Sequence, residues 1–89
     1  MLEPLNAAFG QVLWKLRKKI GISQEDLADR ANLHRTYVSQ LERGLKSPSL
    51  KAIKSLAQAL NKEPHELVKA AEDFLSEEGT KRKVSDRKL

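Results

Sequence analysis

The sequence contains no cysteine, which excludes disulfide bonds, thiolate metal ligands and thiol nucleophiles. Aromatic residues make up only 4% of its 89 residues, and no apolar run approaches the roughly 18 residues that a membrane-spanning helix needs. The first residues also lack the apolar stretch of a secretory signal peptide. We therefore expect a cytoplasmic protein that has no membrane partner.

Residues that could support catalysis or bind metal are equally sparse. His34 and His65 stand far apart, and no group of histidines and carboxylates has the spacing of metal ligands. The sequence also has no glycine-rich loop that could hold a phosphate. We therefore predict that the protein is not an enzyme and has no catalytic residue, metal, cofactor or small-molecule ligand.

The charge of the chain is unevenly distributed. The net charge is +5, and residues 15–54 contain ten basic residues but only four acidic ones. Residues 55–78 are acidic overall, and residues 79–89 are basic again. An anionic partner is therefore expected to bind the basic body of the protein, although a solvated surface of mixed charge is the simpler interpretation of the net charge alone.

Strand signals are missing, because no apolar–polar alternation and no Asn-Gly or Asp-Gly hairpin occurs. Apolar residues recur instead at helical spacing. The first such series is Phe9, Leu13, Leu16 and Ile20, and Leu50 begins another. The pattern predicts an all-α domain whose five helices span about 6–20, 24–31, 35–43, 50–60 and 64–78.

Residues that favour helix ends separate these segments. Ser23 and Ser49 are expected to act as N-caps, and Asn32 tolerates a left-handed backbone conformation. The predicted helix ends include Gly21, Gly44 and Gly79. Since residues 80–89 are basic and almost without apolar side chains, we expect a folded domain over residues 1–79 and a disordered tail.

The second and third predicted helices, together about 24–43, have the pattern of a helix-turn-helix. Ala28 is small enough for the two helices to approach closely, and apolar residues are available to bury between them, namely Leu27, Leu33, Val38 and Leu41. The outward residues of the third helix offer the hydrogen-bonding groups that a DNA major groove accepts, and these residues are Arg35, Thr36, Ser39, Gln40 and Arg43. An ordinary helical hairpin with a polar face remains the alternative.

Residues 9–67 resemble the lambda repressor/Cro-type helix-turn-helix family, also called the xenobiotic-response-element family. The matching stretches are Leu13-Trp-Lys-Leu-Arg17, Ser23-Gln-Glu-Asp-Leu-Ala28, Leu33 through Gly44, and Pro48-Ser-Leu50 through Leu60. Within that family, the size and the string His-Arg-Thr-Tyr-Val-Ser look most like restriction–modification controller proteins. Asn32 departs from the usual glycine of the turn, and His34 from the usual serine or threonine N-cap.

The resemblance implies a compact five-helix, lambda-repressor-like domain that regulates transcription by binding double-stranded DNA with sequence specificity. As a homodimer, such a protein binds a near-palindromic operator, with the helix at about 35–43 in the major groove. Two alternatives use the same fold: an antitoxin-type regulator of a toxin–antitoxin pair, and an adaptor that binds protein.

Candidate DNA contacts follow from side-chain chemistry and from the family. We predict that Arg35 binds guanine and Gln40 binds adenine through paired hydrogen bonds, with shorter contacts from Thr36 and Ser39. The resemblance implies that Gln24 reaches a phosphate. Further phosphate contacts are expected from Tyr37, Arg43 and Lys46. For Arg43 and Lys46, the alternative is a charged surface residue that does not contact DNA.

Two further roles are structural. The resemblance implies an ion pair between Arg17 and Glu42, which would join the first helix to the third. In the last helix, a stripe of apolar residues is expected to form the dimer interface, namely Val68, Ala71, Phe74 and Leu75. The alternative for this stripe is packing against the first helix of the same chain. Trp14 is either covered by the N-terminal segment or meets another chain.

Overall fold

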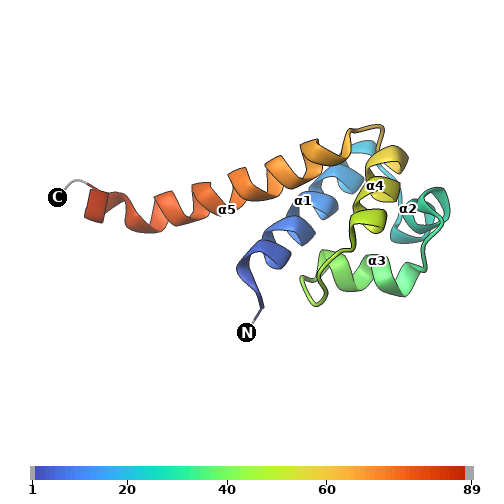
Figure 1. Ribbon diagram of the computed structural model, residues 1–89, viewed down its shortest axis with the longest axis horizontal. Coiled ribbons are helices and arrows are strands. Elements are labelled where there is room, and N and C mark those ends of the chain that lie inside the picture. The colour runs from blue at the N-terminus through green and yellow to red at the C-terminus, as the bar shows by residue number, and fades with distance from the viewer. Residues whose placement is uncertain (1, 88–89) are drawn as a thin grey trace.

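The computed structural model describes the backbone of residues 2–87 and the side chains of residues 2–77. Over that range it is helical, without a strand, as the sequence predicts. The helices are α1 (Pro4–Ile20), α2 (Gln24–Ala31), α3 (Arg35–Glu42), α4 (Leu50–Ala59) and α5 (Pro64–Arg87). In Figure 1, α1 lies along the first part of α5, and α2, α3 and α4 gather at the other side of α1.

The expected helix ends are largely present. The Ser23 hydroxyl accepts a hydrogen bond from the backbone N–H of Asp26, whose carboxylate accepts one from the N–H of Ser23, forming a capping box. Asn32 ends α2 in the left-handed conformation, with φ of 56°. The Ser49 hydroxyl accepts a hydrogen bond from the N–H of Ala52 at the start of α4. These local signals fix where the short helices begin and end.

One hydrophobic core joins all five helices. Its largest fully buried side chains are Leu13, Leu27, Val38, Leu41, Leu56 and Leu67. α1 packs against α3 at Gly10, where an added Cβ would lie 2.6 Å from the backbone oxygen of Glu42 and closer still to that of Leu41. The absence of a side chain at Gly10 therefore lets the two helix backbones approach closely.

Two apolar residues that the helical spacing placed inward lie on the surface instead. Leu50 is 85% exposed, because it is the first residue of α4 and stands at the helix tip, about one turn beyond the core. Ile20 is 49% exposed for the corresponding reason at the last turn of α1. Leu16 and Leu33 are only partly buried against the core.

The predicted end of the last helix is wrong. α5 continues past Gly79 to Arg87, so the segment that we expected to be disordered is helical up to that residue. Residues 80–87 contain no proline and are rich in lysine and arginine, which are good helix formers. A glycine inside a helix costs only about 1 kcal/mol relative to alanine, which does not force a stop. Residues 88–89 lie outside the described residues.

Candidate nucleic-acid interface

The α2–turn–α3 unit sets the direction in which the candidate site faces. The N–H of Leu33 donates to the carbonyl oxygen of Ala28 at 2.8 Å and closes the turn that follows α2. Leu27, Val38 and Leu41 are fully buried, so α3 is held against the core by its inner face. His34 precedes α3 as its N-cap residue but its side chain makes no capping hydrogen bond. The outer face of α3 is therefore presented by a fixed support.

The predicted base-reading residues share that outer face. Arg35 and Thr36 are exposed, and Ser39 and Gln40 are partly exposed. Together with the exposed Arg43 they line one open depression of about 220 Å³. Within residues 2–77, no hydrogen bond or ion pair involves these five side chains, so their polar groups are available to a ligand.

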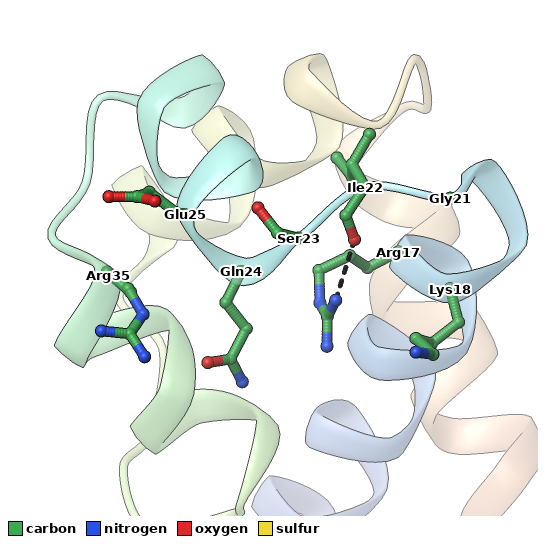
Figure 2. A pocket seen from close by; sticks show the side chains of 8 residues that line it. All are labelled: Arg17, Lys18, Gly21, Ile22, Ser23, Gln24, Glu25 and Arg35. Carbon is green, nitrogen blue, oxygen red and sulfur yellow. Dashed lines mark hydrogen bonds between the residues drawn. The ribbon is translucent and has the colours of Figure 1, made fainter.

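A second, wider depression of about 600 Å³ lies at the N-terminus of α2 (Figure 2). Its lining brings together Arg17, Lys18, Gly21, Ile22, Ser23, Gln24, Glu25 and Arg35. Figure 2 shows Arg35 on one side of Gln24 and Lys18 on the other, so cationic side chains flank the helix end. We call this depression the α2 basin. Lys18 and Arg35 outnumber the one carboxylate of the lining, Glu25, and together with the helix N-terminus they favour an anion.

Lys18 is a residue that the sequence did not single out. In the sequence it is one member of a basic run with Lys15 and Lys19, and nothing in that run marks one lysine as different. In the structure Lys18 lines the α2 basin, and its ammonium lies 5.9 Å from the centroid of the Trp14 ring. The exposed Trp14 thus lies beside this lysine on the surface of α1.

The expected ion pair between α1 and α3 is present. Arg17 Nε donates to Glu42 Oε2 at 2.6 Å, and a terminal nitrogen of Arg17 donates to Glu42 Oε1 at 3.0 Å. The two side chains are only 9% and 3% exposed. The hydrogen bond to Glu42 raises the pKa of Arg17 above its ordinary value, against the opposing effect of burial. Arg17 is therefore a structural cation, although it borders the α2 basin.

Two predicted phosphate-binding side chains also make contacts within the protein. The amide nitrogen of Gln24 donates to Glu42 Oε1 at 3.0 Å. The hydroxyl oxygen of Tyr37 accepts a hydrogen bond from the backbone N–H of Ser49 at 3.3 Å. Each side chain keeps a hydrogen that these bonds do not use, namely the second amide hydrogen of Gln24 and the hydroxyl hydrogen of Tyr37. Both therefore remain able to donate to a phosphate, as does the exposed Lys46 beyond α3.

The predicted dimer stripe of α5 is only partly on the surface. Ala71 is 1% exposed and belongs to the core of its own chain, so it agrees with the alternative of packing against α1 and offers almost no surface of its own to a partner. Its methyl group packs inward because α5 lies against α1 at this point. Phe74 and Leu75 are partly buried against the same core, and the ammonium of Lys15 lies 4.7 Å from the centroid of the Phe74 ring. Val68 remains 38% exposed.

Among the residues that the structure describes, no three histidine or acidic side chains lie together where they could hold a metal ion. None of the helices described is long and apolar enough to cross a membrane.

Comparison with known proteins identifies relatives of the same architecture. Residues 15–67 match the family model described as helix-turn-helix. Control protein C.BamHI of Bacillus amyloliquefaciens is 39% identical over 69 residues, which cover 76% of this chain and 85% of that protein. The crystal structure of the restriction–modification controller protein C.AhdI from Aeromonas hydrophila is 48% identical, with a TM-score of 0.68, over 70% of this chain and 94% of that one.

A further solved structure shows a similar chain on DNA. It is that of the restriction–modification controller protein C.Esp1396I, described as a tetramer in complex with its natural 35 base-pair operator. It is 28% identical to the present chain, with a TM-score of 0.72, and the match covers 80% of this chain and 93% of that one.

Proposed function

The chain belongs to the helix-turn-helix family and resembles its restriction–modification controller proteins, and from this membership we propose that it is a sequence-specific regulator of transcription. It acts by binding double-stranded DNA rather than by catalysis, in the cytoplasm where its operator lies. α3 is the recognition helix, and it enters the major groove with its outer face toward the base edges.

One observation carries this proposal. The outer face of α3 has four polar side chains in one depression that form no hydrogen bond or ion pair among the described residues, namely Arg35, Thr36, Ser39 and Gln40. Arg35 offers paired donors that fit the two acceptors of guanine, and the Gln40 amide fits the donor and acceptor of adenine. Thr36 and Ser39 are shorter and make closer contacts. A helix with these groups turned outward from a buried support matches the requirements of direct base readout.

Phosphate contacts on both sides of α3 fix its position in the groove. The α2 basin receives a phosphate between Lys18 and Arg35, with Gln24 donating its second amide hydrogen. At the other end, Arg43, Lys46 and the Tyr37 hydroxyl meet the backbone. These contacts carry no sequence information but set the register of the base-reading side chains.

Two copies of the chain act together. A single recognition helix reads only a few base pairs, whereas a two-fold pair reads half-sites roughly 34–36 Å apart on a near-palindrome. A homodimer on such an operator therefore provides the specificity that regulation needs.

Selection of bound sequences from a random duplex pool tests the proposal. We expect a near-palindromic consensus whose half-sites are one helical turn apart, and binding that weakens steeply with salt. A chain that selects no consensus and retains no affinity for any duplex at low salt would be an adaptor for protein, and the proposal would fail. Co-purification of a toxin would instead point to the antitoxin alternative.

A further inference from the structure

Trp14 lies on the surface of α1, although tryptophan side chains are largely buried in most proteins. It is 45% exposed and is the sole tryptophan of the chain. Together with Gln11 and Glu42 it lines an open depression of about 250 Å³ between α1 and the end of α3. Neither Leu2 nor Glu3 lines this depression, so these N-terminal residues do not cover the ring. We call it the Trp14 depression.

The Trp14 depression continues the α2 basin along α1. Lys18 lines the basin, and its ammonium lies 5.9 Å from the centroid of the Trp14 ring, within the range of a cation–π contact. The two residues are one turn apart on the same face of α1, and Figure 2 shows Lys18 on the α1 side of the basin. A DNA strand with a phosphate in the basin therefore passes next to Trp14.

The charges at the Trp14 depression permit an anion. Glu42, the one ionisable residue that lines it, is 3% exposed and is paired through both oxygens with Arg17. Within residues 2–77, Lys18 takes part in no ion pair and the indole N–H of Trp14 donates no hydrogen bond. The depression and its border thus offer a cation and a hydrogen-bond donor that the described part of the chain does not use.

We infer that Trp14 contacts the sugar–phosphate backbone of the bound duplex, at the phosphate next to the one in the α2 basin. The indole N–H donates to a phosphate oxygen, and the ring lies against the adjacent deoxyribose. The contact carries no sequence information. The inference rests on the proposed function and adds to it a DNA contact on α1, outside the helix-turn-helix.

The surroundings of Trp14 favour this occupant over a protein partner. Trp14 is the one apolar residue that lines the depression, because Gln11 and Glu42 are polar. An aromatic residue that anchors a protein partner is normally surrounded by further packed contacts that exclude water. A DNA backbone needs only a donor and positive charge, which Trp14 and Lys18 supply together.

Intrinsic fluorescence of the full chain tests the contact, because all tryptophan emission comes from Trp14. The probes are the operator selected from the random pool and, at low salt, a scrambled duplex of the same length. We expect each duplex to lower the rate constant for quenching of Trp14 by acrylamide, since the bound backbone covers the exposed part of the ring. Acrylamide is neutral, so the charge of the DNA does not repel it. An unchanged constant on a bound operator would overturn the inference.

Trp14→Phe keeps an aromatic ring but removes the indole N–H. The loss of a hydrogen bond to a charged group should weaken binding to operator and scrambled duplex alike, by about tenfold, without changing the base preference. Ile20→Ala is the control, since Ile20 is an exposed apolar residue of α1 that lines neither the basin nor the Trp14 depression. Anisotropy of labelled duplexes measures both affinities, and circular dichroism verifies folding. Equal affinities for the two variants would overturn the inference and leave this surface to a protein partner.

Trp14→Lys gives a readout that a purely structural role of Trp14 would not change. Lysine replaces the lost donor and adds a positive charge at the same position. We therefore expect it to bind DNA more tightly than Trp14→Phe at low salt, and to steepen the slope of log affinity against log salt by about 1 relative to the wild type. The wild-type slope in this variant would show that no phosphate lies near residue 14, and the inference would fail.

The two proposals fail in different experiments. A wild type that selects and binds an operator while the quenching of Trp14 stays unchanged would support the function and refute the α1 contact. A wild type that binds no duplex, even at low salt, would refute both.

Discussion

Arg17 of α1 and Glu42 of α3 form a two-point ion pair that lies almost wholly out of solvent. The pair extends further, because Arg17 also donates to the carbonyl oxygen of Ile22 at 2.9 Å and Glu42 accepts from Gln24. Four segments are thereby joined: α1, the α1–α2 connection, the first residue of α2 and the last residue of α3. The network fixes the angle between the recognition helix and the α2 basin beside it.

We expect Glu42→Ala to destabilise the protein far more than Arg43→Ala. Removal of Glu42 leaves the buried Arg17 guanidinium without its anionic partner, which typically costs about 3–5 kcal/mol. Arg43, by contrast, is an exposed residue with no ion pair among the residues described. Thermal unfolding followed by circular dichroism measures the difference. Equal melting temperatures for the two variants would show that the ion pair adds nothing to stability.

Arg35→Ala should weaken binding to the selected operator and relax the preference at one base position in each half-site. The loss of paired donors to guanine is expected to cost about 1–3 kcal/mol. Fluorescence anisotropy with the operator and with duplexes that vary at each position measures both effects. Lys46→Ala is the control, because loss of a phosphate contact should weaken all duplexes alike. An Arg35→Ala variant with equal losses on operator and scrambled duplex would exclude direct readout by this residue.

Lys18→Ala should reduce the dependence of binding on salt. If Lys18 neutralises a phosphate in the α2 basin, its removal lowers the slope of log affinity against log salt by about 1, on every sequence alike. Lys19→Ala provides a closely matched control, since Lys19 is the next residue in the same basic run but does not line the basin. The same slope for both variants would mean that the basin holds no phosphate.

Local signals explain why so much of the fold was predictable. Ser23, Asn32 and Ser49 act on their own neighbours in the chain, so the helix ends that they mark are independent of tertiary structure. The outward face of α3 was also predictable, because the residues on its inner face are apolar and the remainder must point outward.

The errors arise where the burial of a side chain depends on which neighbouring helix covers it. Helical spacing places Leu50 on the apolar face of α4, but it does not reveal that the core ends one turn before the helix tip. Ala71 fits an apolar stripe equally well in either role, and only the position of α1 decides that it is buried. Lys18 differs from its basic neighbours solely through the basin that it borders.

Gly10 shows the same dependence on a neighbouring element, and it leads to a further prediction. In an isolated helix, Gly10→Ala would be favourable by about 1 kcal/mol, because alanine has the higher helix propensity. In the folded protein its Cβ would overlap the backbone oxygens of Leu41 and Glu42, which cannot move without displacing α3. We therefore expect Gly10→Ala to lower the melting temperature and to weaken operator binding.

The magnitude should be about 1–3 kcal/mol, as for other insertions into a closely packed contact. Gln11→Ala, at the next and exposed position of α1, controls for helix propensity and should leave the melting temperature nearly unchanged. Thermal unfolding and operator titration of both variants separate the two effects. A Gly10→Ala variant that is more stable than the wild type would contradict this prediction. It would show that α1 and α3 can move apart, and that the close contact at Gly10 does not hold the recognition helix in place.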